Sequence, residues 1–244
     1  MAEHNSADFD WSQLDRGGLA SFMWLISPRV VDRPLTVDQL HTIISRHIRK
    51  FMPVRVSKKF DVKVERGLVY TGGFYYPHFD QDNKKCIEIV YAYNPTVPTL
   101  TITPRRFWRM CMLFADTVLH EMIHMRQYRR RDHKWSAEYV STAARKKQRE
   151  DQRYLGSLDE IDAYGFNIAC ELVSRFDNPT AAVEYLDEQQ RNRRKKFTSW
   201  RMYLQAFGHD HEHPVIVRLK KTIARYIPHA AQGRPYTNKH WLSW

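Results

Sequence analysis

His120, Glu121 and His124 form the motif His-Glu-x-x-His, which is the part of this sequence best suited to carry chemistry. Histidines at positions i and i+4 of a helix lie one turn apart on one face, so both imidazoles can reach the same ion. The glutamate faces the same cleft and can take a proton from the attacking water and pass it to a leaving amine. The spacing therefore predicts a zinc site with Glu121 as general base. The alternative is a pair of surface histidines on an amphipathic helix.

A catalytic zinc ion needs a third protein ligand and an open fourth position. Glu160 is the first candidate, because it begins a second amphipathic segment 36 residues beyond His124. The small Ala163, one turn later in that segment, would let the second helix pack closely on the first. Ser157-x-x-Glu160 also matches a capping box, so Glu160 can instead serve the start of its own helix.

His133 is the second candidate for the third ligand. It lies nine residues past His124, so a sharp turn after Arg130 would have to bring it back towards the motif. The alternative for His133 is an exposed position in a basic loop. The residues by themselves leave the choice between Glu160 and His133 open.

The elements before the motif follow from hydrophobic periodicity. A capping box at residues 36–39, followed by apolar residues at helical spacing, predicts a helix that Pro53 ends. Residues 86–93 alternate between apolar and polar side chains, which indicates a half-buried strand. Further short strands are expected at 62–65, 68–71 and 99–103, with a turn at Gly72 and Gly73.

The motif itself lies in a long helix. Thr103 can cap this helix with Pro104 at its first position, and neither glycine nor proline interrupts the chain from there to about Arg130. The order of a helix, a small sheet, a long helix and a helical C-terminal half predicts an α+β fold. Later helix starts are expected at 157, 178–179, near 198 and at 213–214, with Gly208 as a C-terminal stop.

Composition limits the class of protein. The chain has 244 residues, of which 43% are hydrophobic and 13% aromatic, so a wholly disordered or low-complexity protein is excluded. No uncharged stretch is suited to span a bilayer as a helix, and the N-terminus lacks a signal-peptide pattern. Three widely spaced cysteines disfavour a disulfide framework or a cysteine zinc site. A cytoplasmic location and no membrane partner are therefore expected.

The net charge of +12 is the second feature of the sequence that indicates a function. Such an excess attracts polyanions, although solvated helix ends and loops are the alternative interpretation. No nucleic-acid-binding fingerprint accompanies the charge. The clusters lie at 129–131, 145–147, 191–196 and 220–221.

The pattern His120-Glu121-x-x-His124 followed by Glu160-x-x-Ala163 resembles that of the gluzincin zinc metallopeptidases, in which a glutamate on a later helix completes the site. The wider strings at 120–127 and 154–164 are similar to small zincin-like proteins of bacteriophages. The resemblance covers roughly residues 85–175. It implies a minimal zincin-like domain, with an N-terminal backing helix, a small mostly antiparallel sheet and the HExxH helix, followed by a helical C-terminal half. The strand at 86–93 would be the edge strand that aligns an extended substrate.

Some positions depart from that family. Many gluzincins place an acid four residues after the third ligand to orient a ligand histidine, whereas this chain has Tyr164, with Asp159 or Asp162 as substitutes. The proton donor or oxyanion stabiliser stays open between Tyr164, Tyr203 and the histidines of residues 208–213. That histidine-rich loop could instead hold a second metal or bind one only adventitiously.

A second, weaker resemblance is to SprT/Spartan-like DNA-associated metalloproteases. Their HExxH motif is followed by a histidine in an HGxxF-type segment, and residues 133–139 are similar to it without the glycine. This resemblance would make His133 the third ligand, and the basic charge suits it.

The sequence thus predicts a Zn²⁺-dependent peptidase with His120, His124 and Glu160 as ligands and Glu121 as base. The alternative is a catalytically silent zincin scaffold that binds DNA or a virion assembly through its basic surface. A protein or peptide is the expected substrate, in the cytoplasm of a host or in the virion if a phage encodes the chain. Three parts are expected: an arm at 1–30, a zincin-like core at 31–176 and a basic helical extension at 177–244.

Overall fold

The computed structural model describes residues 16–49, 54–60, 70–82, 84–94, 96–134, 148–176, 178–188 and 198–232. The strand predicted at 62–65 lies outside the described residues, as do the basic clusters at 145–147 and 191–196. The chain forms two compact units, Met1–Met125 and Arg126–Trp244. The boundary falls inside one continuous helix, α5 (Pro104–Arg130).

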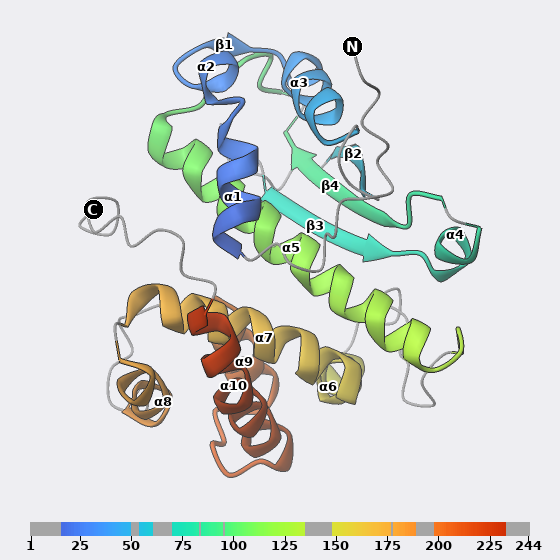
Figure 1. The fold of residues 1–244 in the computed structure, drawn as a ribbon. Coiled ribbons are helices and arrows are strands. Elements are labelled where there is room, and N and C mark those ends of the chain that lie inside the picture. The colour runs from blue at the N-terminus through green and yellow to red at the C-terminus, as the bar shows by residue number, and fades with distance from the viewer. Residues whose placement is uncertain are drawn as a thin grey trace. The chain divides into compact units, whose positions relative to one another are not determined.

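The first unit combines helices with two small sheets (Figure 1). Strand β4 (Ile87–Tyr93) lies between β2 (Val54–Phe60) and β3 (Tyr70–Tyr75), and β1 (Pro34–Leu35) pairs antiparallel with β5 (Leu100–Thr101). Helices α1 (Arg16–Trp24) and α2 (Ser27–Val30) precede the first strand and were not predicted. The helices of this unit besides α5 are α1 (Arg16–Trp24), α2 (Ser27–Val30), α3 (Val37–Arg49) and α4 (Pro77–Gln81).

Helix α3 begins at the predicted capping box. The backbone N–H of Gln39 donates to Thr36 Oγ1 at 3.1 Å, and the backbone N–H of Thr36 donates to Gln39 Oε1 at 2.8 Å. Both bonds satisfy groups that a helix start would otherwise leave without partners. The predicted helix is confirmed, and its apolar face is buried at Leu40, Ile43, Ile44 and Ile48.

The three-stranded sheet is mixed, which corrects the prediction of a mostly antiparallel sheet. Strand β4 runs antiparallel to β3 but parallel to β2, with Val54 opposite Ile87. The strand at 86–93 was also expected at the edge, and it lies in the centre instead. The cause of both errors is β2, which was not predicted because its sequence contains three basic residues. Charged side chains are common on edge strands, where they oppose further strand pairing.

Gly72 and Gly73 lie inside β3, so the prediction of a turn there is wrong. A Cβ atom on Gly73 would meet Thr117 Cγ2 at 2.5 Å and Glu121 Cγ and Oε1 at 3.0 Å. Glycine is therefore required by the close approach of α5 and not by a turn conformation. A Cβ atom on Gly72 would meet nothing within 4 Å.

Helix α5 starts and ends where the sequence predicts. The hydroxyl of Thr103 accepts from the backbone N–H of Arg106 at 3.4 Å, and Pro104 occupies the first turn. The guanidinium of Arg16 on α1 makes a two-bond ion pair with Asp116, at 2.5 and 2.9 Å. Helix α5 is buried around most of its circumference, through Phe107, Met110, Cys111, Phe114, Ala115, Val118, Leu119, Met122, Ile123 and Met125.

The second unit contains only helices in its described residues. The predicted starts near 157, 178, 198 and 213 are confirmed, and Gly208 has the left-handed φ of +67° after α9 (Thr198–Ala206). Its core is formed around Trp200, Tyr203 and Ile223. Its helices are the last turn of α5, α6 (Gln148–Gly156), α7 (Leu158–Arg175), α8 (Pro179–Glu188), α9 (Thr198–Ala206) and α10 (Pro214–Gln232).

Helices α7 and α10 of this unit pack closely. A Cβ atom on Gly165 would meet Thr222 Cγ2 at 2.5 Å, so the glycine lets the two helix backbones approach. The coarse prediction of an α+β fold with a helical C-terminal half is confirmed. None of the helices in the described ranges is long and apolar enough to cross a membrane.

Candidate metal centre

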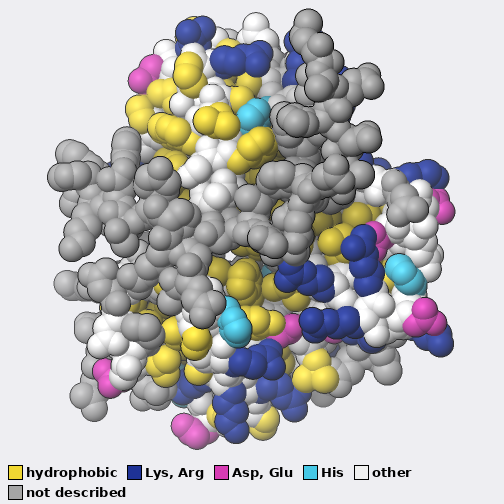
Figure 2. Space-filling view, viewed as in Figure 1, with side chains coloured by type: hydrophobic (Ala, Val, Ile, Leu, Met, Phe, Trp, Pro, Cys, Tyr) yellow, Lys and Arg dark blue, Asp and Glu magenta, His cyan; other side chains and the backbone are white. Residues whose placement is uncertain are grey.

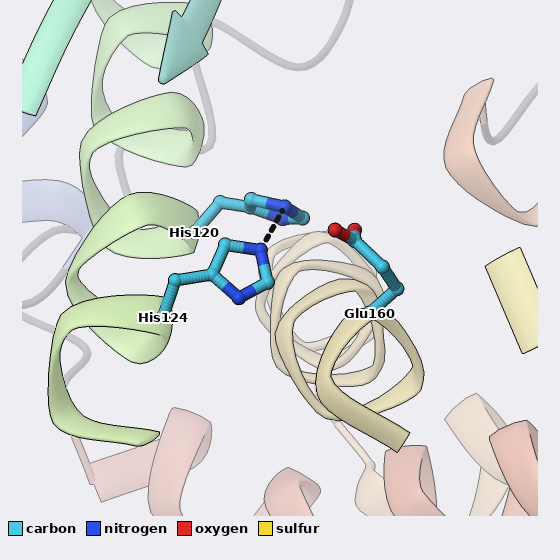
Figure 3. A group of neighbouring side chains, drawn as sticks. All are labelled: His120, His124 and Glu160. Carbon is cyan, nitrogen blue, oxygen red and sulfur yellow. Dashed lines mark hydrogen bonds between the residues drawn. The ribbon is translucent and has the colours of Figure 1, made fainter. Parts of the chain in front are cut away.

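His120 and His124 project from neighbouring turns of α5 (Figure 3). Their Nε2 atoms lie 3.1 Å apart, and their ring planes meet at 80°. Two nitrogens that each lie about 2.0–2.1 Å from a tetrahedral zinc ion are separated by about 3.4 Å. The observed separation therefore fits two imidazoles that share one ion.

Glu160 on α7 completes the group. One ligand atom from each of His120, His124 and Glu160 lies within 4.8 Å of the other two, and the carboxylate points towards the two rings (Figure 3). His120 and Glu160 are each 7% exposed. Buried ionisable groups in proteins are paired or coordinate a metal. The donor set of two nitrogens and one oxygen, its spacing and its burial can therefore hold a metal ion.

The capping interpretation of Glu160 accounts for its backbone and not for its carboxylate. Ser157 is the N-cap of α7, and its hydroxyl accepts from the backbone N–H of Glu160 at 3.4 Å. In a reciprocal capping box the glutamate side chain would accept from the N–H of Ser157. That N–H instead donates to the carbonyl of Tyr154 at 3.2 Å. Glu160 thus occupies the N3 position of the cap while its side chain faces the histidines.

His133 follows α5 but is not part of the group. Asp132 and His133 both adopt left-handed backbone conformations, with φ of 52° and 58°, and they end the helix. The ring of His133 packs edge-on against Tyr128, with centroids 5.4 Å apart. Among the described residues, His133 is absent from the cluster of donor atoms that His120 and His124 form.

Glu121 is buried beside the histidines and contributes no atom to the donor group. Its side chain lies against β3, since the position of a Cβ on Gly73 is only 3.0 Å from Glu121 Oε1. The carboxylate is therefore held close to the backbone of an edge strand. Sequence reasoning missed this role of Gly73, and a pair of glycines beside an alternating strand is the signal that was available.

Asp159 and Asp162 are placed differently from the sequence expectation that one of them orients a ligand histidine. Asp159 accepts two bonds from the guanidinium of Arg131, at 2.7 and 2.8 Å. Asp162 accepts from Gln127, from Arg225 and from the hydroxyl of Tyr226. Burial, assisted by the bond to Asp162, raises the pKa of Tyr226 to about 12, so this hydroxyl stays protonated at neutral pH.

The two tyrosines that are candidates for the proton donor differ in how deeply they are buried. Tyr203 is fully buried in the core of the second unit, whereas Tyr164 is half-buried, one turn after Glu160. Their rings meet edge-on with centroids 5.6 Å apart. In the described part of the chain, the histidines of residues 208–213 form no group of three donors. Tyr164 therefore has the better position of the two tyrosines.

The three cysteines, all within described residues, are buried and form no disulfide. Burial raises the pKa of the Cys111 thiol to about 12 and also raises the pKa of Tyr91 beside it. A thiol with so high a pKa is a poor nucleophile at neutral pH. Cys111 therefore serves the core between α5 and the sheet.

Comparisons with known proteins give no match to a family model, to a curated protein or to a solved structure.

Proposed function

We propose that this protein is a zinc-dependent metallopeptidase of gluzincin type. The observation that carries the proposal is the buried group of His120, His124 and Glu160, with Glu121 beside it and outside the donor set. Zinc is favoured because two imidazoles and one carboxylate, with a fourth position for water, are its usual catalytic ligands. When bound, the ion supplies a Lewis acid for the scissile carbonyl and lowers the pKa of water towards about 7.

We assign the role of general base to Glu121. It follows His120 directly on α5, and its buried carboxylate lies next to the backbone of β3. In this mechanism Glu121 takes a proton from the attacking water and passes it to the leaving amine. For the hydrogen bond to the developing oxyanion we propose Tyr164, one turn after Glu160 on α7.

Strand β3 is suited to align an extended substrate, a role that the sequence had suggested for β4. Opposite residues of an antiparallel pair alternate between hydrogen-bonded and non-bonded pairs. The N–H of Tyr76 donates to the carbonyl of Cys86 at 2.7 Å, directly after Tyr75 pairs with Ile87. Counting back along the ladder, the N–H and carbonyl of Gly73 point away from β4. We propose that a peptide adds on that side as a further strand, close to Glu121.

The experiment is a peptide-library digest with zinc-loaded protein, with chelated protein and with Glu121→Gln. Loss of a general base lowers turnover by about 10²- to 10⁴-fold, while zinc content and fold should stay unchanged. Glu171→Gln is the matched control, since this glutamate pairs with Arg175 at the far end of α7. Equal activity of Glu121→Gln and wild type, or no stoichiometric zinc in protein purified without chelator, would contradict the proposal.

A second candidate function rests on charge. The second unit holds 23 of the 39 Lys and Arg residues but 14 of the 27 Asp and Glu residues, so nine of the twelve excess charges lie there. Helix α10 contains four basic residues and no acid, and Arg218, Lys221 and Arg225 are exposed. Figure 2 shows Lys and Arg side chains gathered on this face of the helical unit.

This second candidate is a catalytically silent scaffold that binds DNA or a virion assembly. Its test is the salt dependence of binding to heterogeneous DNA, because each neutralised phosphate contributes a slope of about −0.9 in log K against log salt. Arg218→Ala with Lys221→Ala should reduce the slope. Absence of binding at low salt, together with absence from purified particles, would exclude this function.

A further inference from the structure

The first turn of α7, which carries Glu160, is bound to the end of α5 by side chains that all belong to the second unit. Gln127 Nε2 donates to the backbone carbonyl of Asp159 at 3.1 Å and to Asp162 Oδ2 at 3.2 Å. Arg131 adds a two-bond ion pair with Asp159. These contacts fix both the backbone and the side chains at the start of α7.

The carboxylate of Asp162 also accepts two hydrogen bonds from side chains of α10. Its Oδ1 atom accepts from Arg225 Nη2 at 2.6 Å and from the hydroxyl of Tyr226 at 2.8 Å. The Tyr226 ring packs edge-on against Phe166 of α7, with centroids 5.3 Å apart. Asp162 is therefore the residue at which bonds from α5 and from α10 meet on α7.

Gln127 and Asp162 are each close in sequence to one of the metal ligands. Gln127 comes three residues after His124 on the same helix, and Asp162 comes two residues after Glu160 on α7. A displacement of α7 that breaks the Gln127–Asp162 bond would also move Glu160 relative to His124. Metal affinity depends on how firmly such supporting groups hold the ligands before the ion binds.

We propose that Asp162 is a positioning residue of the metal centre, which holds the first turn of α7 so that Glu160 faces His120 and His124. The inference rests on the proposed zinc site and not on peptidase activity. Asp162 acts through the backbone of α7 and through Gln127. Its role differs from that of an acid bonded directly to a ligand histidine, because its bonds run to Gln127, Arg225 and Tyr226.

The test compares the zinc affinity of wild type, Asp162→Asn and the control Glu171→Gln, measured against a competing chromophoric chelator. We expect Asp162→Asn to lose about 10- to 100-fold in affinity, the range for outer-shell partners, and Glu171→Gln to match wild type. The visible spectrum of Co²⁺-loaded protein should change in Asp162→Asn as well, because it reports ligand geometry. A merely structural role would lower the melting temperature of the metal-free protein while affinity and spectrum stay unchanged.

Tyr226→Phe provides a milder variant if Asp162→Asn fails to fold. It removes one bond to Asp162 and keeps the packing against Phe166, and we expect a smaller loss of affinity in the same direction. If Asp162→Asn folds and binds zinc with wild-type affinity, the inference about Asp162 is overturned, whereas the metal centre is not. If Asp162→Asn does not fold, wild-type zinc affinity in Tyr226→Phe has the same consequence. Absence of zinc binding in wild type would overturn the metal centre and the inference together, and zinc binding without peptide hydrolysis would overturn only the proposed activity.

Discussion

The two histidines and Glu160 reach the same point by different physical means. His120 and His124 are neighbours because a helix repeats every 3.6 residues, so any helix over this segment brings their rings together. Glu160 is 36 residues further along, and its position depends on the packing of α7 and on the bonds made by Asp159 and Asp162. A local motif therefore specifies two ligands, whereas the third depends on tertiary structure.

The removal of one of the two histidines that the helical motif brings together should have the largest effect on the metal centre. His124→Ala removes an imidazole from a three-ligand set, so stoichiometric zinc and all peptide hydrolysis should be lost. Because a ligand that binds only the folded state stabilises it, the melting temperature of the variant should no longer rise when zinc is added. Metal analysis and thermal unfolding with and without zinc measure this. A zinc-dependent rise equal to that of wild type would contradict the assignment of His124.

The next largest effect is expected when Glu160, the ligand whose position depends on tertiary structure, is replaced. Glu160→Gln keeps the N-cap bond from its backbone N–H to Ser157 but removes the charged ligand. Zinc affinity should fall by more than the about 10- to 100-fold typical of an outer-shell partner.

The matched control for Glu160→Gln is His133→Ala, which should bind zinc as wild type does. Chelator competition on both variants decides between the two candidates for the third ligand. Normal affinity in Glu160→Gln with weak binding in His133→Ala would favour the SprT/Spartan-like arrangement instead.

An intermediate effect is expected at Gly73, where α5 meets β3. A methyl group there would lie 2.5 Å from Thr117 Cγ2 and 3.0 Å from Glu121, so Gly73→Ala must shift the base or the strand. A displacement of about 1 Å costs on the order of 100-fold in turnover, and zinc affinity should change little. Gly72→Ala is the control, because its added methyl group meets no atom within 4 Å. Steady-state kinetics of both variants test this, and equal turnover would show that Gly73 does not position Glu121.

The smallest effect concerns the polar cluster at Asp162 and depends on pH. The pKa of Tyr226 is raised from 10.0 to about 12, chiefly by burial and then by its bond to Asp162. A raised pKa contributes stability that is fully present below about pH 10 and is lost as the pH rises towards 12. The unfolding free energy of wild type should therefore fall over this range relative to that of Tyr226→Phe. Parallel pH dependences in urea unfolding would contradict this account of Tyr226.

The regions that could be predicted from the sequence are those with local signals. The caps at Thr36, Thr103 and Ser157 fixed three helix starts, and the helical period placed His120 and His124 together. Helix α2 has no side-chain cap hydrogen bond at its start, and it was missed together with α1.

The regions that could not be predicted depend on pairing between distant segments. Strand β2 has a charged face, so its parallel pairing with β4 leaves no pattern in its own sequence. Gly73 resembled a turn residue because the need for a glycine comes from Glu121 and Thr117, more than 40 residues away. The role of Gln127 could not be predicted, since its bonds to α7 exist only in the folded protein.

The most direct test of the metal centre is an anomalous-scattering crystal structure of the zinc-loaded protein. We expect one ion, about 2.0–2.2 Å from nitrogen atoms of His120 and His124 and from a carboxylate oxygen of Glu160. Glu121 should lie beside the ion without coordinating it, and His133 should stay packed against Tyr128. An ion bound by His133 or Glu121 in place of Glu160, or no ion between the two histidines, would show that this metal centre is wrongly assigned.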